Sequence, residues 1–170
     1  MVSYGNREYE DSLLELTDIL TKQGFNIVGA GAFITKHSIF QEVANKRPDY
    51  DDEEIIKSFS KKCIETITTN RFKKLKINGN RPYIEKRHLE LFPIGDSNCI
   101  ECGDCKRICP VEAIKEGNFI ETNKEKCISC TACIYTCPVG SRGYHYENFA
   151  KAYEKFKEVN SKRKEPELFI

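Results

Sequence analysis

Nine of the 170 residues are cysteines, and eight of these lie between Cys99 and Cys137. They form two runs of the same pattern, Cys-x2-Cys-x2-Cys-x3-Cys-Pro, in which each cysteine of the first run has a counterpart 28 residues later. The pairs are 99 with 127, 102 with 130, 105 with 133 and 109 with 137. Cysteine thiolates are soft anionic ligands that hold iron in tetrahedral sites, so the spacing predicts iron–sulfur chemistry.

In this pattern, three closely spaced cysteines bind one [4Fe–4S] cluster, and the fourth, which precedes proline, binds the other cluster. We therefore predict two clusters with crossed ligand sets: Cys99, Cys102, Cys105 and Cys137 for the first, and Cys127, Cys130, Cys133 and Cys109 for the second. Zinc sites also use Cys-x2-Cys pairs, but four-coordinate zinc leaves no role for a third evenly spaced cysteine. The ninth cysteine, Cys63, lies on the apolar face of an expected helix, which favours a buried, inert thiol.

Residues 98–145 contain NCIECGDCKRICPVEAI and KCISCTACIYTCPVGSR, and they resemble the bacterial two-cluster ferredoxins. The resemblance implies a compact fold of short hairpins and helices, two [4Fe–4S] clusters and one-electron transfer at low potential. Ile100 and Ile128, each beside the first cysteine of its run, are expected to shield the clusters from water. Phe119 and Tyr135 are expected to pack near them.

The charges almost cancel, because 27 Lys and Arg against 26 Asp and Glu leave a formal net charge of +1. Such a balance argues against a surface built to bind nucleic acid. No stretch approaches the roughly 20 apolar residues that span a bilayer, so we expect no membrane segment. The N-terminal residues show no apolar leader, and the odd number of cysteines argues against a disulfide scaffold. We therefore expect a reducing, cytoplasmic location.

Before residue 71 the pattern changes to alternating strands and helices. The expected elements are a strand at 2–4, a helix over 9–23 that stops at Gly24, a buried strand over 25–33, and a helix from about Asp49 to 69. This β-α-β-α order is typical of a parallel sheet with crossover helices. The predicted fold class is therefore α/β for residues 1–70, followed by an α+β ferredoxin-type domain over 93–145 and a C-terminal helix.

The loop from Tyr4 to Tyr9, YGNREY, and the elements around it resemble the second half of a flavodoxin-like domain. The whole chain resembles bacterial proteins that fuse a flavodoxin-like domain to a two-cluster ferredoxin. In flavodoxins the corresponding loop flanks the isoalloxazine ring of FMN, so the resemblance implies Tyr4 and Tyr9 as flavin contacts. The strands that complete a flavodoxin site are missing before Val2, which favours a structural unit without flavin over FMN binding.

A two-strand sheet also leaves an edge exposed. Either the rest of the chain covers this edge, or a partner completes the sheet. One hypothesis is a homodimer that pairs the truncated edges. A truncated gene product and a misplaced start codon are the other hypotheses.

A basic linker and a C-terminal segment complete the chain. Residues 71–92 hold seven Lys and Arg against two Glu, which favours a linker or the docking of an acidic redox partner over nucleic-acid binding. Residues 146–170 are expected to contain an amphipathic helix with Phe149, Tyr153 and Phe156 on one face. A mobile tail follows, of which only the last three residues are expected to dock.

These features predict a cytoplasmic carrier that passes single electrons between redox protein partners. The alternative is a flavin-linked iron–sulfur oxidoreductase, or its electron-transfer subunit, with FMN on the N-terminal half. A third hypothesis is a binding or assembly protein in which the clusters only stabilise the fold. The carrier is favoured because it needs only residues that are present.

Overall fold

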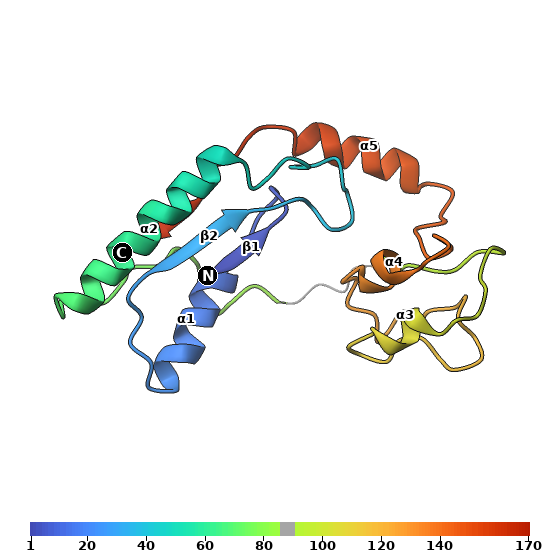
Figure 1. Cartoon of the computed structure of the whole chain (residues 1–170), viewed down its shortest axis with the longest axis horizontal. Coiled ribbons are helices and arrows are strands. Elements are labelled where there is room, and N and C mark those ends of the chain that lie inside the picture. The colour runs from blue at the N-terminus through green and yellow to red at the C-terminus, as the bar shows by residue number, and fades with distance from the viewer. Residues whose placement is uncertain (86–90) are drawn as a thin grey trace. The chain divides into compact units, whose positions relative to one another are not determined.

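The computed structural model describes residues 1–85 and 91–170, and the chain divides into two compact units (Figure 1). The first unit comprises Met1–Glu85 together with Phe156–Ile170, and the second comprises Lys86–Lys155. Both ends of the chain therefore belong to the same unit. The last basic residues of the expected linker, at positions 86 and 87, lie outside the described residues.

A small three-stranded sheet forms the centre of the first unit, in the order β1 (Val2–Tyr4), β2 (Ala30–Ile34) and β3 (Glu167–Phe169). β1 runs parallel to β2, with Val2 opposite Ala32, as a crossover connection requires. β3 pairs with β2 in the antiparallel direction. The expected two-strand sheet thus has a third strand, which comes from a tail that was expected to be largely mobile.

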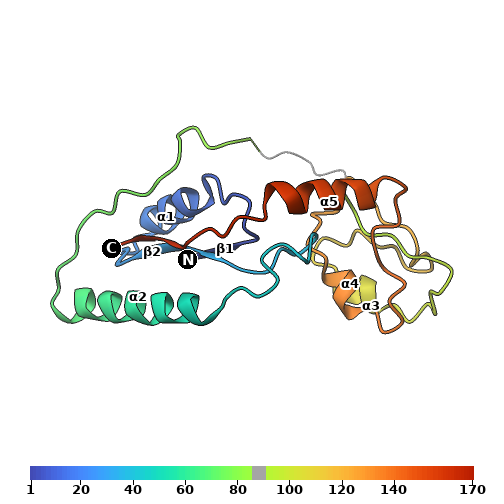
Figure 2. The ribbon, with the colours of Figure 1, turned by 90° about the horizontal axis from the view of Figure 1, so that it is seen from above.

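Two helices cover the sheet, one on each face (Figure 2). α1 (Ser12–Lys22) buries Leu13 in a cluster with the alanines of β2. α2 (Tyr50–Thr68) places Phe59 against Phe33 on the other face, with ring centroids 5.9 Å apart. Because successive residues of a strand point to opposite faces, covering both faces buries every residue of β2.

The ends of these helices follow local signals in the sequence. Gly24 comes directly after the residue that caps α1 and has a φ of +88°, a conformation that glycine adopts without strain. α2 begins with a capping box. The Asp49 side chain accepts the Asp52 N–H at 3.2 Å, and the Asp52 side chain accepts the Asp49 N–H at 2.9 Å.

The described part of the basic segment is bound to α1. The guanidinium of Arg81 donates to the Asp18 carboxylate at 2.7 and 2.8 Å, and the Tyr83 hydroxyl donates to the same carboxylate at 2.6 Å. These two hydrogen-bonding partners lower the pKa of Asp18 to about 2. The Asn80 N–H donates to Asp11 at 2.7 Å. This segment therefore packs as part of the first unit.

Buried polar contacts hold the C-terminal residues against the first loop and α2. The amide of Asn6, which is 3% exposed, donates to the carbonyl of Asn160 at 2.9 Å. Arg47 donates to the carbonyl of Lys164 at 2.9 Å and forms an ion pair with the buried Asp52. These contacts explain why the tail is ordered and continues into β3.

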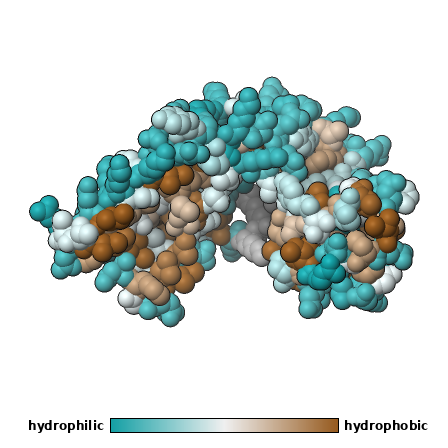
Figure 3. Space-filling view, in the orientation of Figure 1, coloured by the Kyte–Doolittle hydropathy of each residue, from teal (hydrophilic) through white to brown (hydrophobic). Residues whose placement is uncertain are grey.

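The second unit has little regular structure beyond α3 (Asp104–Arg107), α4 (Ala132–Thr136) and the first residues of α5 (Phe149–Val159). One buried cluster in this unit consists of Cys105, Ile114 and Phe119. Figure 3 shows hydrophobic side chains on its surface, and the exposed ones include Ile100, Ile108, Ile128, Tyr135 and Val139. A small unit with such a core needs further stabilisation.

The aromatic face expected on the C-terminal helix is present in α5. Phe149 stacks on Tyr144 within the second unit, with ring centroids 4.8 Å apart. Phe156 stacks on Phe40 within the first unit, with ring centroids 4.0 Å apart. The boundary between the two units therefore falls inside this helix, between Lys155 and Phe156.

We expect Asp52→Asn to destabilise the first unit by about 3 kcal/mol, because the change leaves the buried Arg47 guanidinium without its close counter-charge. The matched control is Asp51→Asn in the same helical turn. The Asp51 side chain is 76% exposed and lies 3.9 Å from Arg163, so its loss should cost less than about 1 kcal/mol. Urea unfolding, monitored by far-ultraviolet circular dichroism, measures the loss of stability in both variants. Equal midpoints for the two variants would contradict the role of the buried pair.

Candidate metal centre

The eight cysteines of the two runs line two separate hollows in the second unit. One hollow is lined by Cys99, Cys102, Cys105 and Cys137. The other is lined by Cys109, Cys127, Cys130 and Cys133. In each hollow, three cysteines come from one run and the fourth comes from the other run. The structure therefore brings together the same two groups of four that the spacing predicts as ligand sets.

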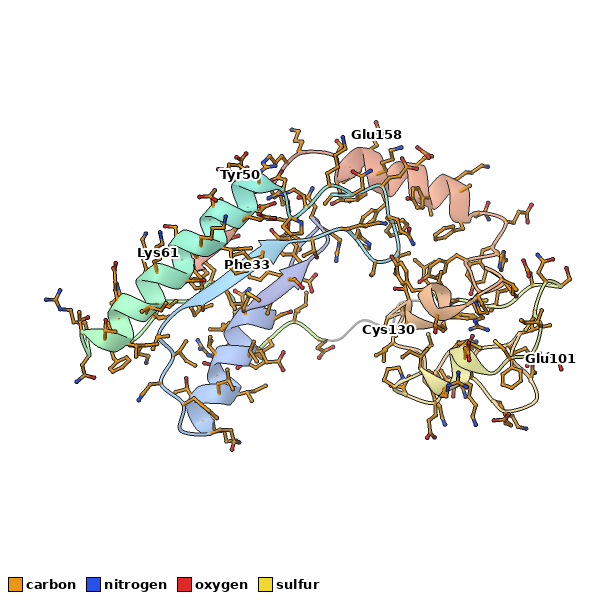
Figure 4. The ribbon with its side chains drawn as sticks, viewed as in Figure 1. Phe33, Tyr50, Lys61, Glu101, Cys130 and Glu158 are labelled. Atoms are coloured by element: carbon orange, nitrogen blue, oxygen red, sulfur yellow. The ribbon has the colours of Figure 1, made fainter. Side chains whose placement is uncertain are left out.

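The loops around the two hollows repeat the same backbone conformation. Residues with positive φ recur at the 28-residue interval, as Glu101 (56°) with Ser129 (55°), Gly103 (75°) with Thr131 (65°), and Glu112 (50°) with Gly140 (66°). α3 and α4 begin directly after Gly103 and Thr131, and Figure 4 shows Glu101 and Cys130 in the loops that precede them. A β-branched residue is strained at positive φ, so the loop rather than local preference imposes this conformation at Thr131.

Backbone N–H groups approach several of the cysteine sulfurs. The Ala113 N–H donates to Cys109 Sγ at 3.2 Å, and the Ser129 N–H donates to Cys127 Sγ at 3.4 Å. Burial raises the pKa of the Cys137 thiol, but the backbone N–H groups that follow it outweigh burial and lower this pKa overall. N–H groups directed at sulfur stabilise the thiolate, which is the form that binds metal.

The third cysteines of the two runs, Cys105 and Cys133, have the same cationic neighbour. Burial raises the pKa of both thiols, and the positive charge of Arg142 opposes this effect at each. Arg142 is 3% exposed and lines the first hollow, while its Nη2 atom lies 4.0 Å from the Cys133 sulfur in the second. A buried guanidinium therefore lies beside both groups of cysteines.

Apolar side chains cover the hollows unevenly. Phe119, which is 8% exposed, and Ile114 pack against Cys105. Ile100 lines the first hollow and Ile128 the second, but they are 61% and 48% exposed and shield these sites only in part. Tyr135, expected to pack near a cluster, is 61% exposed and is not among the residues that line either hollow.

The donor set suits a cluster of several metal atoms. Each hollow offers four cysteine sulfurs and no histidine or carboxylate. Within residues 1–85 and 91–170, no three His, Cys, Asp or Glu side chains lie close enough together to hold one metal ion. A single zinc ion draws its thiolates to about 2.3 Å, whereas a cube distributes four ligand sulfurs over four iron atoms.

Two buried polar atoms near these cysteines have no hydrogen-bond partner in the described part of the chain. They are the Nε atom of Arg142 and the hydroxyl of Tyr144. Burial raises the pKa of Tyr144, and the charge of Cys127 and its neighbours raises it further. Sequence reasoning missed both residues. The repeat contained a signal for Arg142, because the position 28 residues earlier is Ile114.

The two tyrosines predicted to contact flavin lie together in the first unit. The ring centroids of Tyr4 and Tyr9 are 5.3 Å apart, and both rings pack against the cluster that contains Leu13. The Tyr9 hydroxyl donates to Glu167 at 2.8 Å. Flavin binding at these residues, and the likeness of this unit to flavodoxins, stay predictions.

Cys63 lies on α2, apart from both hollows. Its half-buried sulfur lies so close to Gly29 that a Cβ atom there would approach it to 2.7 Å. Burial raises the pKa of this thiol, which disfavours the reactive thiolate. The raised pKa fits the expected inert thiol, but the side chain is only partly buried rather than buried as expected.

Comparison with known protein families identifies the cysteine-rich segment. Residues 93–138 match the 4Fe-4S dicluster domain family, and the match includes all eight cysteines of the two runs. The chain therefore carries a 4Fe–4S ferredoxin-type domain in its second unit.

Similar curated proteins each match a minority of this chain. The formate dehydrogenase iron-sulfur subunit of Wolinella succinogenes is 38% identical over 47 residues, which are 25% of this chain and 24% of the relative. An uncharacterised ferredoxin of Methanocaldococcus jannaschii is 47% identical over 47 residues, 25% of this chain and 30% of the relative. A selenate reductase subunit of Mesobacillus selenatarsenatis is 34% identical over 71 residues, 36% of this chain and 24% of the relative. The chain spans less than a third of each relative.

A solved structure of the membrane-bound sulfane sulfur reductase, an archaeal respiratory membrane complex, aligns with 58% of this chain and 68% of its own chain. The identity is 24% and the TM-score is 0.29. In the described part of the present chain, every helix is too short or too polar to cross a membrane.

The repeated backbone predicts opposite effects of removing glycine at position 140 and introducing it at the equivalent position 112. A Cβ atom added to Gly140 meets nothing within 4 Å, so Gly140→Ala should cost only the strain of its positive φ, about 1 to 2 kcal/mol. Glu112→Gly relieves the same strain, and the greater freedom of glycine in the unfolded chain offsets part of this gain.

The temperature at which the visible cluster absorbance is lost should therefore fall in Gly140→Ala and stay equal or rise in Glu112→Gly. A fall of equal size in both variants would contradict the equivalence of the two positions.

Proposed function

We propose that this protein is a one-electron carrier whose second unit holds two low-potential [4Fe–4S] clusters. The observation that carries this proposal is the pair of four-cysteine hollows, each lined by three cysteines of one run and the fourth of the other. Thiolates in sets of four, with backbone N–H groups directed at sulfur, suit iron–sulfur cubes.

In this proposal the first cluster is bound by Cys99, Cys102, Cys105 and Cys137, and the second by Cys127, Cys130, Cys133 and Cys109. When bound, the clusters supply reversible one-electron chemistry. The chain's own residues act as thiolate ligands, donate backbone hydrogen bonds to sulfur, and limit the access of water through Phe119 and Ile114. Because each cluster takes ligands from both runs, cluster assembly and folding of this unit are coupled.

The proposed partners are redox proteins, as in oxidoreductase complexes. Relatives named as iron-sulfur or reductase subunits, for formate dehydrogenase and for selenate reductase, support this choice. The exposed Ile100 and Ile128 line the hollows and offer apolar area to a docking partner. The near-zero net charge disfavours nucleic acid, and the eight thiol ligands suit a reducing cytoplasm.

Pairing of two copies through a sheet edge stays a prediction. β2 is the central strand and pairs with β3 along one edge and with β1 along the other, so β1 lies at an edge of the described sheet. A dimer through β1 predicts a mass that depends on concentration in light scattering. A monomer at all concentrations would contradict it.

The alternative function is a flavin-linked iron–sulfur oxidoreductase with FMN on the first unit. The observation that favours it is the aromatic pair of Tyr4 and Tyr9. The packing of both rings against the cluster with Leu13, and the hydrogen bond from Tyr9 to Glu167, favour a structural role instead.

Protein purified without oxygen should contain about eight iron and about eight sulfide per chain, and dithionite should bleach its visible absorbance. Quantification of iron, sulfide, zinc and flavin in one sample tests the proposal. Zinc in place of iron would contradict it. Stoichiometric FMN would select the flavin-linked alternative, and clusters that dithionite does not reduce would favour a structural role.

Double substitutions test the crossed ligand sets. Cys109→Ala with Cys127→Ala removes two ligands from one proposed cluster, so the iron content should fall to about half and one normal [4Fe–4S] signal should remain in electron paramagnetic resonance spectra. Cys109→Ala with Cys99→Ala damages both clusters and should leave no normal signal. If instead Cys109→Ala with Cys99→Ala kept one normal signal and Cys109→Ala with Cys127→Ala kept none, each run would bind its own cluster. Cys63→Ala is the control and should retain all of its iron.

A further inference from the structure

Arg142 is a buried cation, and all of its hydrogen bonds except the one to the Cys133 sulfur go to neutral oxygen acceptors. Its terminal nitrogens donate to the carbonyl oxygens of Pro93 at 2.7 Å and of Phe119 and Ile120 at 2.9 Å each, and to the hydroxyl of Thr122. Its Nε atom has no partner among the described residues. The ion pairs found in the described part of the second unit do not include it. The side chain is nonetheless 3% exposed.

Burying a guanidinium in this way is costly unless negative charge lies nearby. The anionic groups available are the cysteine thiolates. Nη2 lies 4.0 Å from the Cys133 sulfur, and the same side chain lines the hollow that contains Cys105. One cation thus serves as neighbour to both groups of four cysteines.

The fold itself does not demand a charge at this place. The position equivalent to Arg142 in the first half is Ile114, which is 2% exposed and lines the other hollow. The two loops have the same left-handed positions, including Glu112 and Gly140, so an apolar side chain suffices where the backbone is alike. Carbonyl hydrogen bonds alone therefore do not account for an arginine here.

We propose that Arg142 is the buried counter-cation of both clusters and that its charge raises their reduction potentials. This inference rests on the proposed function. Reduction adds one electron to a cluster, from a low-potential redox protein or from dithionite, and needs no proton because arginine stays protonated. A cluster with its four thiolates is an anion whose negative charge grows on reduction. A fixed cation in a poorly solvated site therefore stabilises the reduced state more than the oxidised state. Arg142 acts through its positive charge and does not bind iron.

The test is a redox titration of the full chain, followed by electron paramagnetic resonance. Arg142→Gln keeps an amide donor but removes the charge, so the potentials of both clusters should shift to more negative values. Arg142→Lys keeps the charge, so its potentials should stay close to those of the wild type. The matched control is Arg107→Gln, which removes the same charge from a side chain that is 75% exposed, where solvent and salt screen it. No shift is expected in the control.

Unchanged potentials in a cluster-loaded Arg142→Gln variant would overturn this inference and leave the proposed function intact. Equal shifts in Arg142→Gln and Arg142→Lys would also overturn it, because lost hydrogen bonds rather than lost charge would then be the cause. A wild-type chain that binds no iron–sulfur cluster would overturn the proposed function and this inference together.

A second measurement covers the case in which Arg142→Gln fails to assemble. Electron–nuclear double resonance of reduced wild-type protein, grown with isotope-labelled arginine, should show nitrogen coupled to a cluster. The coupling should persist in Arg107→Lys and vanish in Arg142→Lys. Absence of coupling in the wild type would overturn the inference.

Discussion

Convergence of four thiols in each of two hollows is the constraint on which the second unit depends. Its apolar cluster of Cys105, Ile114 and Phe119 is small, and α3 and α4 span only four and five residues. Helices of that length are not stable on their own. The loops also hold non-glycine residues at positive φ, which costs conformational energy. In a 4Fe–4S domain, bonds between metal and thiolate offset such costs, because metal binding contributes directly to folding. Such a contribution would account for a unit with an irregular backbone and a small apolar core.

The first unit is stabilised by different means. Its sheet includes strands from both ends of the chain, and the buried pair of Arg47 and Asp52 holds α2 against the carbonyl of Lys164. The amide of Asn6 fixes the same C-terminal segment to the first loop. Residues 86–155 are thus inserted, in sequence, between two segments of one packed unit.

The sequence predicted the parts of this protein that depend on local chemistry. Cysteine spacing predicted two ligand sets, and the members of each set line one hollow; their binding of clusters stays a prediction. Gly24 and Asp49 marked helix ends, because capping involves residues within one turn. β3 was missed because three residues in a charged tail carry no strand pattern. Its pairing depends on contacts with residues more than 100 positions away, such as the one between Asn6 and Asn160. Arg142 was missed because its burial depends on the carbonyls that surround it.

The two halves of the cysteine domain show which features the shared geometry requires and which it does not. Cysteines, the prolines after them and the left-handed positions recur at the 28-residue interval. Gly103 has Thr131 as its equivalent, and Glu112 has Gly140. The backbone conformation is therefore kept at these positions although the residue type changes. Ile114 and Arg142 differ in charge at equivalent buried places. The two sites therefore share one backbone design but not one electrostatic environment. The cation that distinguishes them lines the first hollow and lies 4.0 Å from the Cys133 sulfur in the second.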